Sequence, residues 1–166
     1  GALEGVRGLP GKIAGYYLAC GSNQGALRLC EEALAANPRD PDALYVKGEA
    51  SRRLADLETA RGALAEVLRI SPGHPYACLS MARLKFRTAA PAESLSLFET
   101  YFAGPREDEA EESRATARLE YGRALRAAGR HQDGADEFAL LIEAEPTRSE
   151  YYSELSATLY RLRLRR

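Results

Sequence analysis

The sequence predicts an all-α protein built by repetition of one helical hairpin, and three regularities support this fold class. The first is a column of small residues spaced by 34, 34, 40 and 34 positions, namely Ala14, Gly48, Ala82, Gly122 and Ser156. The second is a pair of columns with matching spacing, namely Cys30, Leu64, Phe98 and Phe138, and Ala26, Ala60, Ser94 and Gly134. The third is a proline that ends three of the units, at Pro38, Pro72 and Pro146. Independent columns that share one period indicate a repeat architecture.

The columns predict one array over residues 1–166. Its expected units are residues 7–40, 41–74, 75–114 with a six-residue insertion, and 115–148, followed by a capping helix at 149–164. A 34-residue helical hairpin with small residues where its helices cross resembles the tetratricopeptide repeat (TPR). The second unit has Leu44, Gly48, Ala60, Leu64, Val67 and Pro72 at the matching places, whereas Lys47 stands where that family usually has a large apolar residue. The resemblance extends from Lys12 to the C-terminus and implies an α–α superhelix (a TPR solenoid).

The first unit has a weak beginning. Residues 1–11 contain four glycines and one proline, so we expect a loose lead-in, because glycine disfavours a helix interior by about 1 kcal/mol relative to alanine. The first helix is expected over about Lys12–Ala19, where apolar residues follow the spacing of one helix face. Asn23 could cap the next helix, which should end near Ala36, before an Asn-Pro pair that stops a helix.

The second unit has the strongest helix signals. Asp40 followed by Pro41 combines a capping side chain with a proline at the first helical position, so a helix is expected over Pro41–Leu54. Asp56 could cap a second helix over about Leu57–Ile70, whose inner face is apolar. A Ser-Pro-Gly sequence ends this helix before the third unit.

The third unit contains the insertion. We expect helices over about Pro75–Arg87 and Pro91–Phe102, each opened by a proline that the first helical turn tolerates. The six extra residues must lie between Tyr101 and Gly122. Acidic residues directly after Pro105 favour a helix N-terminus over a loop, so we expect an extended helix over about Pro105–Ala128.

The last helices are expected over His131–Ala144 and from Ser149 almost to the end of the chain, with Ser149 as a cap. The final helix resembles the first helix of each hairpin in its apolar pattern. A lone helix of this kind would cap the array, because it covers the last apolar face and presents a more polar outer side.

Bulk composition excludes several classes. The net charge is −1, which gives no general attraction to nucleic acid or membranes, and no apolar run approaches the roughly 20 residues of a membrane helix. The first residues lack the apolar region of a signal peptide. The chain starts at Gly1 and not at a methionine, so it could be a piece of a longer protein. Reduced thiols would suit a cytoplasmic location, although the sequence does not identify the compartment.

Candidate chemical groups are few. Cys30 and Cys78 lie in apolar columns and are interpreted as small buried hydrophobic residues, with no second thiol at metal-ligand spacing. His74 and His131 lie between helices and are interpreted as solvent-exposed turn residues. The sequence contains no nucleotide-binding, zinc-protease, nucleophile-elbow or calcium-loop motif. We therefore expect no enzyme activity, no cofactor and no metal site.

The surface expected to bind a partner is the concave side of the superhelix, which the resemblance assigns to the first helices of successive hairpins. The register places an arginine-rich, partly aromatic set of side chains there, namely Tyr45, Glu49, Arg52, Tyr76, Arg83, Phe86, Arg87, Arg123 and Arg126. Arginine pairs with carboxylates through two hydrogen bonds and stacks on aromatic rings. The hypothesis is a non-catalytic scaffold that binds an acidic segment of another protein.

Other functions remain open at this point. The chain could be a docking or assembly module of a larger protein or enzyme, and its ends could support self-association. A helical-repeat nucleic-acid binder is disfavoured by the near-zero net charge and the acidic insertion. Some TPR proteins hold acidic chaperone tails with a clamp of Lys, Asn and Arg. No alignment frame of this chain supplies that clamp, so a chaperone-tail adaptor is also disfavoured.

Overall fold

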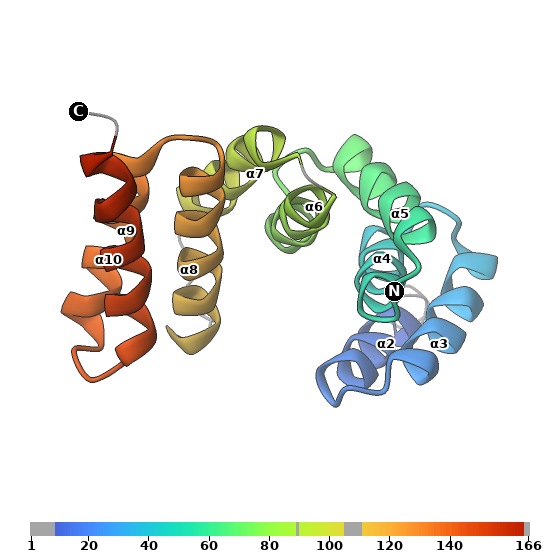
Figure 1. Ribbon diagram of the computed structural model, residues 1–166. Helices are drawn as coiled ribbons and strands as arrows, with labels where there is room; N and C mark the ends of the chain where they lie inside the picture. Colours follow the sequence, from blue (N-terminus) through green and yellow to red (C-terminus); the bar gives the residue numbers. More distant parts are fainter. Residues whose placement is uncertain (1–8, 89, 105–110, 165–166) are drawn as a thin grey trace. The chain divides into compact units, whose positions relative to one another are not determined.

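The computed structural model describes residues 9–88, 90–104 and 111–164, and every regular element in these ranges is a helix (Figure 1). The helices are α2 (Leu9–Ala19), α3 (Asn23–Ala36), α4 (Pro41–Arg53), α5 (Leu57–Ile70), α6 (Pro75–Arg87), α7 (Pro91–Ala103), α8 (Glu111–Ala127), α9 (His131–Ala144) and α10 (Ser149–Arg163). The predicted all-α fold class is confirmed.

The helices belong to two compact units, Gly1–Leu84 and Lys85–Arg166, whose boundary falls within α6. In the first unit α2 packs on α3, α3 on α4 and α4 on α5, and α2 also contacts α4. In the second unit α7 packs on α8, and α8, α9 and α10 lie side by side (Figure 1). The single continuous array remains a prediction.

The small-residue column marks the crossing of the two helices within a hairpin. A Cβ atom added to Gly48 would lie 2.7 Å from Leu64 Cγ, and one added to Gly122 would lie 2.6 Å from Phe138 Cε1. Both contacts join residues of the first and second sequence columns at the same register. The third column lies against the same crossing, since a Cβ atom on Gly134 would approach the carbonyl oxygen of Gly122 at 3.0 Å. Close approach of the two backbones therefore explains why these positions hold small residues.

Two of the four predicted caps are confirmed. The Asp40 carboxylate accepts hydrogen bonds from the backbone N–H groups of Asp42 and Ala43 at 3.0 and 3.2 Å, and the Asp56 carboxylate accepts one from Thr59 at 3.2 Å. The other two predictions are wrong by one position. Asn23 and Ser149 are the first helical residues of α3 and α10, and the residues before them occupy the cap positions without a side-chain hydrogen bond.

One helix start also differs from the prediction. α2 begins at Leu9, before the expected Lys12, because a proline and a glycine are tolerated in a first turn whose N–H groups have no intrahelical partner. The remaining part of the predicted loose lead-in, residues 1–8, lies outside the described residues. α8 has 17 residues and is the longest described helix, as expected for the insertion. Its predicted beginning at 105–110 also lies outside the described residues.

The histidines are less exposed than expected. His131, the first residue of α9, is 5% exposed, so the interpretation as a solvent-exposed turn residue is wrong, because α9 begins at this residue and its side chain packs inward. His74 is half-buried, and its Nδ1 atom accepts a hydrogen bond from the backbone N–H of Ala77 at 3.2 Å. It therefore acts as a side-chain cap at the beginning of α6.

Cys30 and Cys78 are buried, as predicted, and Cys20 is exposed. Burial, followed by the charge of Glu31, raises the pKa of the Cys30 thiol to about 11. Of the described helices, none is both long and apolar enough to cross a membrane. Within the described ranges, no group of three or more His, Cys, Asp or Glu residues could hold a metal ion.

Candidate functional site

An aromatic group lies on the first unit where α4 meets the beginning of α6. The ring of Tyr45 stacks on His74 with centroids 5.5 Å apart, and it lies 6.0 Å from the ring of Tyr76. Tyr45 is half-buried, and Tyr76 is 42% exposed. Burial, together with the charge of Glu49, raises the pKa of Tyr45 to about 12, so its phenol is neutral and acts as a hydrogen-bonding group. Two of the predicted site residues, Tyr45 and Tyr76, are therefore in contact.

Glu49 lies beneath this surface and is only 2% exposed. It accepts hydrogen bonds from Arg52 at 2.8 and 2.7 Å, from Arg53 Nε at 2.8 Å and from Ser80 Oγ at 2.7 Å. Burial alone would raise the pKa of Glu49, but these hydrogen bonds and the guanidinium charges lower it to about 2. Arg53 Nη1 also donates to the backbone carbonyl of Leu18 at 2.9 Å. The carboxylate thus links α4 to α6, and Arg53 extends this network to α2. The carboxylate is not itself accessible to a partner.

The second unit contains a comparable cluster between α8 and α10. Arg123 donates to Glu154 at 2.7 Å and to Glu150 at 2.8 Å, and Arg126 pairs with Glu154 Oε2 at 2.5 Å. Arg126 also donates to Thr158 Oγ1 at 3.3 Å. Burial would raise the pKa of Glu154, but the two arginines lower it. The two predicted arginines of this unit are therefore held by carboxylates of the same chain.

The other predicted residues lie in α6. Arg83 is half-buried, and its charge acts on Tyr45. Phe86 and Arg87 occupy the last turn of this helix, which belongs to the second unit, and they are half-buried and exposed respectively. The predicted site residues are thus divided between the two units.

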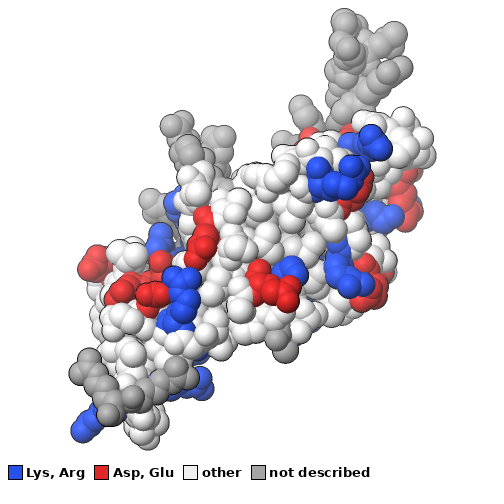
Figure 2. All heavy atoms as spheres, turned by 90° about the horizontal axis from the view of Figure 1, so that it is seen from above, with Lys and Arg blue, Asp and Glu red and all other residues white. Residues whose placement is uncertain are grey.

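The predicted binding surface did not include several residues of these clusters, namely Ser80, Glu150, Glu154 and Thr158. One signal was present in the sequence, because Glu49 precedes Arg52 and Arg53 at the spacing of neighbours on a helix face. The contacts between helices, such as Glu49 with Ser80, had no local signal. Figure 2 shows the outcome on one face, where Lys and Arg side chains lie directly beside Asp and Glu side chains.

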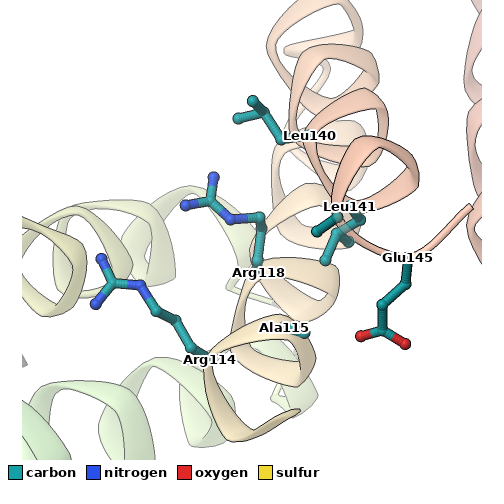
Figure 3. Close-up of a pocket in the computed structure, with 7 residues that line it drawn as sticks. Arg114, Ala115, Arg118, Leu140, Leu141 and Glu145 are labelled. Carbon is teal, nitrogen blue, oxygen red and sulfur yellow. The ribbon is translucent and has the colours of Figure 1, made fainter. Parts of the chain in front are cut away.

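A pocket of 390 Å³ also lies on the second unit, where the beginning of α8 meets the end of α9 (Figure 3). It is lined by Arg114, Ala115, Arg118, Leu140, Leu141, Ala144 and Glu145. The guanidinium groups of Arg114 and Arg118 lie 5.9 and 5.2 Å from the ring centre of Phe102. In Figure 3 both arginines leave α8 on the same side, away from Glu145. The beginning of α8 therefore adds a partly apolar depression that the sequence did not predict, lined by two arginines and Glu145, with Arg118 paired to Glu137.

Residues 13–75 match the family model described as tetratricopeptide repeat. Residues 13–75 therefore contain TPR units. The match includes the hairpin α4–α5 with its Gly48–Leu64 crossing, so the resemblance drawn from the sequence columns is confirmed. The comparison with curated proteins found no match.

Solved structures with the same fold cover most of this chain. MamA from Desulfovibrio magneticus RS-1 is 23% identical with a TM-score of 0.75, covering 93% of this chain and 84% of its own. YrrB, described as a TPR protein with an unusual peptide-binding site, is 16% identical with a TM-score of 0.76, covering 92% and 75%. PilW, described as a widely conserved type IV pilus biogenesis factor, is 22% identical with a TM-score of 0.74, covering 92% and 68%. At these identities the likeness concerns the fold alone.

Proposed function

We propose that this TPR chain is a non-catalytic protein-interaction scaffold, and that its first unit binds an acidic segment of a partner protein. The binding surface is formed by Tyr45, Arg52, Arg53, Tyr76 and Arg83, and is called the α4–α6 surface below. The description of YrrB as having a peptide-binding site supports a role in binding peptides for this fold.

The observation that carries the proposal is an exposed aromatic ring beside guanidinium groups. Tyr76 is 42% exposed and rests on Tyr45, so its ring has a fixed position without being covered. The side chain of Arg53 is 39% exposed, and it shares the single carboxylate of Glu49 with Arg52. Tyrosine and arginine are enriched among the residues that dominate binding energy at interfaces, and arginine favours a carboxylate partner.

Glu49 has a positioning role in this proposal. Its carboxylate holds Arg52 and Arg53 by hydrogen bonds of 2.7 to 2.8 Å, so both guanidinium groups are ordered before a partner arrives. A group that is already ordered loses less conformational entropy on binding, which improves affinity. Glu49 thus contributes to binding without touching the partner.

The arginines of the second unit contribute less to binding in this proposal. Arg123 and Arg126 already pair with Glu150 and Glu154, and a partner would have to displace these carboxylates. The net gain from such an exchange is small, since one ion pair replaces another. The α4–α6 surface is therefore the principal site.

The experiment is affinity capture with the chain and matched variants. Tyr76→Ala and Arg83→Glu each alter the α4–α6 surface. Their controls are Tyr16→Ala, which removes a 75% exposed ring from α2, and Arg28→Glu, which makes the same charge change at an exposed position of α3. We expect partners that are retained by both controls and lost by both site variants. The acidic segment is then located by peptide mapping of the captured protein.

Two outcomes would contradict the proposal. Capture of the same proteins by the site variants and by the wild type would exclude the α4–α6 surface. Loss of the captured material after nuclease treatment, with an affinity that falls steeply with salt, would show that the ligand is a nucleic acid.

A further inference from the structure

The outer face of α10 is apolar, which differs from the polar outer side expected of a capping helix. Tyr152, Leu159 and Tyr160 are 47%, 48% and 65% exposed. Together with Leu155, Ser156 and Arg163 they line a depression of 570 Å³. These six residues are called the α10 outer face. The expectation of a polar outer side is wrong because this helix has large apolar residues at positions that no described helix covers.

The repeat register shows what normally covers such a face. Ser156 belongs to the same column as Gly48 and Gly122, and those two glycines contact Leu64 of α5 and Phe138 of α9 respectively. In both hairpins the second helix lies against the small residue of the first. The α10 outer face is therefore equivalent to a surface that accepts a second helix, and Ser156 is exposed because none of the described helices occupies that place.

The second helices of this chain share one pattern, which defines the chemistry that the face would accept. The fourth helical residue is small, and the eighth and eleventh are buried apolar residues. In α5 they are Ala60, Leu64 and Val67, and in α9 they are Gly134, Phe138 and Leu141. An occupant with this spacing would place a large apolar side chain over Ser156, as Phe138 lies over Gly122.

The charges near the ends of these helices set a second requirement for a helix that binds the α10 outer face. Three of the second helices carry an acidic residue in their first turn, namely Glu58, Glu93 and Asp133. In one hairpin this residue pairs with the last turn of the first helix, since Lys85 Nζ lies 2.6 Å from Glu93 Oε2. The last turn of α10 is also basic, with Arg161 and Arg163. Arg163 lines the depression described above and a smaller one of 240 Å³ with Gln132, Leu159 and Leu162, and no acidic residue lines either.

We propose that the α10 outer face is a docking site for an amphipathic helix of a partner protein, bound antiparallel to α10 in the place of a second helix. The partner helix has an acidic first turn, a small fourth residue and apolar eighth and eleventh residues. An antiparallel helix brings its N-terminal turn to the C-terminal end of α10. There Arg163 lies one helical turn beyond Leu159, which occupies the position equivalent to Lys85, and it is the cation in reach of the acidic side chain. This site is separate from the α4–α6 surface, so neither proposal depends on the other.

The chain supplies its own probe. A labelled peptide of residues 130–145, acetylated and amidated at its ends, carries the sequence of α9 with Asp133, Gly134 and Phe138. The exposed Gln132–Asp136 hydrogen bond is replaced by a lactam bridge: position 132 is changed by Gln132→Lys, and the new amine is condensed with the Asp136 carboxyl with loss of water. The bridge keeps the peptide helical, since isolated helices of this length are marginal in water. Fluorescence anisotropy with the intact chain measures its affinity.

Two variants of α10 test the site. Ser156→Phe places a ring where a second helix must approach closely, and we expect it to weaken peptide binding by at least about tenfold. Ala157→Phe adds a ring at the next residue, which is also exposed but points away from the outer face, and we expect a change of less than about twofold. Both positions are exposed, so circular dichroism should show an unchanged fold. A peptide with Phe138→Glu should not bind.

Three different results would contradict the proposed docking site. No saturable binding to the wild-type chain, or equal binding to the Ser156→Phe variant, would overturn the docking site. The wild type and the Ser156→Phe variant would also bind the peptide equally if the peptide displaced the chain's own α9 instead of binding the α10 outer face. Sedimentation of the chain alone gives the remaining outcome. A dimer that Ser156→Phe abolishes would identify a second copy as the occupant and overturn the assignment to a partner protein.

Discussion

The two units have side chains of opposite charge at equivalent positions of the repeat. Glu49 in α4 and Arg123 in α8 are 74 residues apart, the sum of one 34-residue and one 40-residue spacing. Each contacts the next first helix 31 residues later, Glu49 through Ser80 and Arg123 through Glu154. In the first unit one carboxylate binds two arginines of its own helix. In the second unit two arginines of α8 bind two carboxylates of α10.

The comparison shows that a shared register fixes where a polar cluster lies but not what remains for a partner. In the first unit the carboxylate is buried and Arg53 stays partly exposed, so a guanidinium is presented at the surface. In the second unit the charges balance within the cluster, and the pairs connect α8 to α10. One cluster is thus suited to binding and the other to holding neighbouring helices together.

Removing the central carboxylate of each cluster should give the largest difference in stability between the two units. Glu49→Gln leaves Arg52 and Arg53 without a buried counter-charge, and we expect it to lower the free energy of unfolding by about 3 kcal/mol. Glu154→Gln acts on a more exposed cluster, with side-chain exposures of 14% for Glu154 and 34% for Arg123, so we expect about 1 kcal/mol. Urea unfolding followed by circular dichroism measures both. Equal losses would remove the distinction between the clusters.

The pH dependence sharpens the same comparison. In the folded chain the pKa of Glu49 is lowered to about 2 from the 4.5 of an unperturbed glutamate, which is taken as its value in the unfolded chain. A lowered folded-state pKa contributes stability above the unfolded-state value, and that contribution is lost as the pH falls towards the folded-state value. The stability difference between the wild type and Glu49→Gln should therefore be constant above pH of about 5 and decrease between about 5 and 2. A difference independent of pH over this range would contradict the assigned charge state.

The helix crossings should respond alike in both units. Gly48→Ala and Gly122→Ala each place a Cβ atom within 2.7 Å of a side chain of the second helix, and we expect each to lower the free energy of unfolding by about 2 kcal/mol. Gly62→Ala is the control, because nothing lies within 4 Å of its added Cβ. It should stabilise the chain by about 0.5–1 kcal/mol through helix propensity. A stabilising effect at Gly48 or Gly122 would show that the crossing is looser than described.

The turns between helices give the smallest effect. Ala55 has a φ of 64°, and Gly129 has a φ of 85° at the equivalent position of the second unit. An L residue in this left-handed region is disfavoured by about 1–2 kcal/mol relative to glycine. We expect Ala55→Gly to stabilise the chain by about 1 kcal/mol, and Gly129→Ala to destabilise it by a similar amount. Thermal unfolding of both variants checks the signs, and the same sign in both would contradict the shared turn geometry.

The sequence predicted the features that recur in each repeat unit and those that depend only on a few neighbouring residues. The small-residue columns identified the crossings of Gly48 and Gly122, and Asp40 and Asp56 were recognised as caps because the signal for each lies within a few neighbouring residues. The burial of His131 and the exposure of Tyr152 and Leu159 depend on which helices pack around them, which a single helix pattern does not contain. The contacts between helices join residues 31 positions apart, Glu49 with Ser80 and Arg123 with Glu154, so the arginine columns could be aligned but the contacts across helices could not be assigned.

The most direct test of the difference between the two units is the affinity of the acidic partner segment for Arg53→Gln and Arg123→Gln. The two arginine side chains are similarly exposed, 39% and 34%, and undergo the same chemical change. The account predicts that Arg53→Gln weakens binding by at least about tenfold, whereas Arg123→Gln changes affinity by less than about twofold and lowers the free energy of unfolding. A loss of affinity in Arg123→Gln with unchanged binding by Arg53→Gln would contradict it.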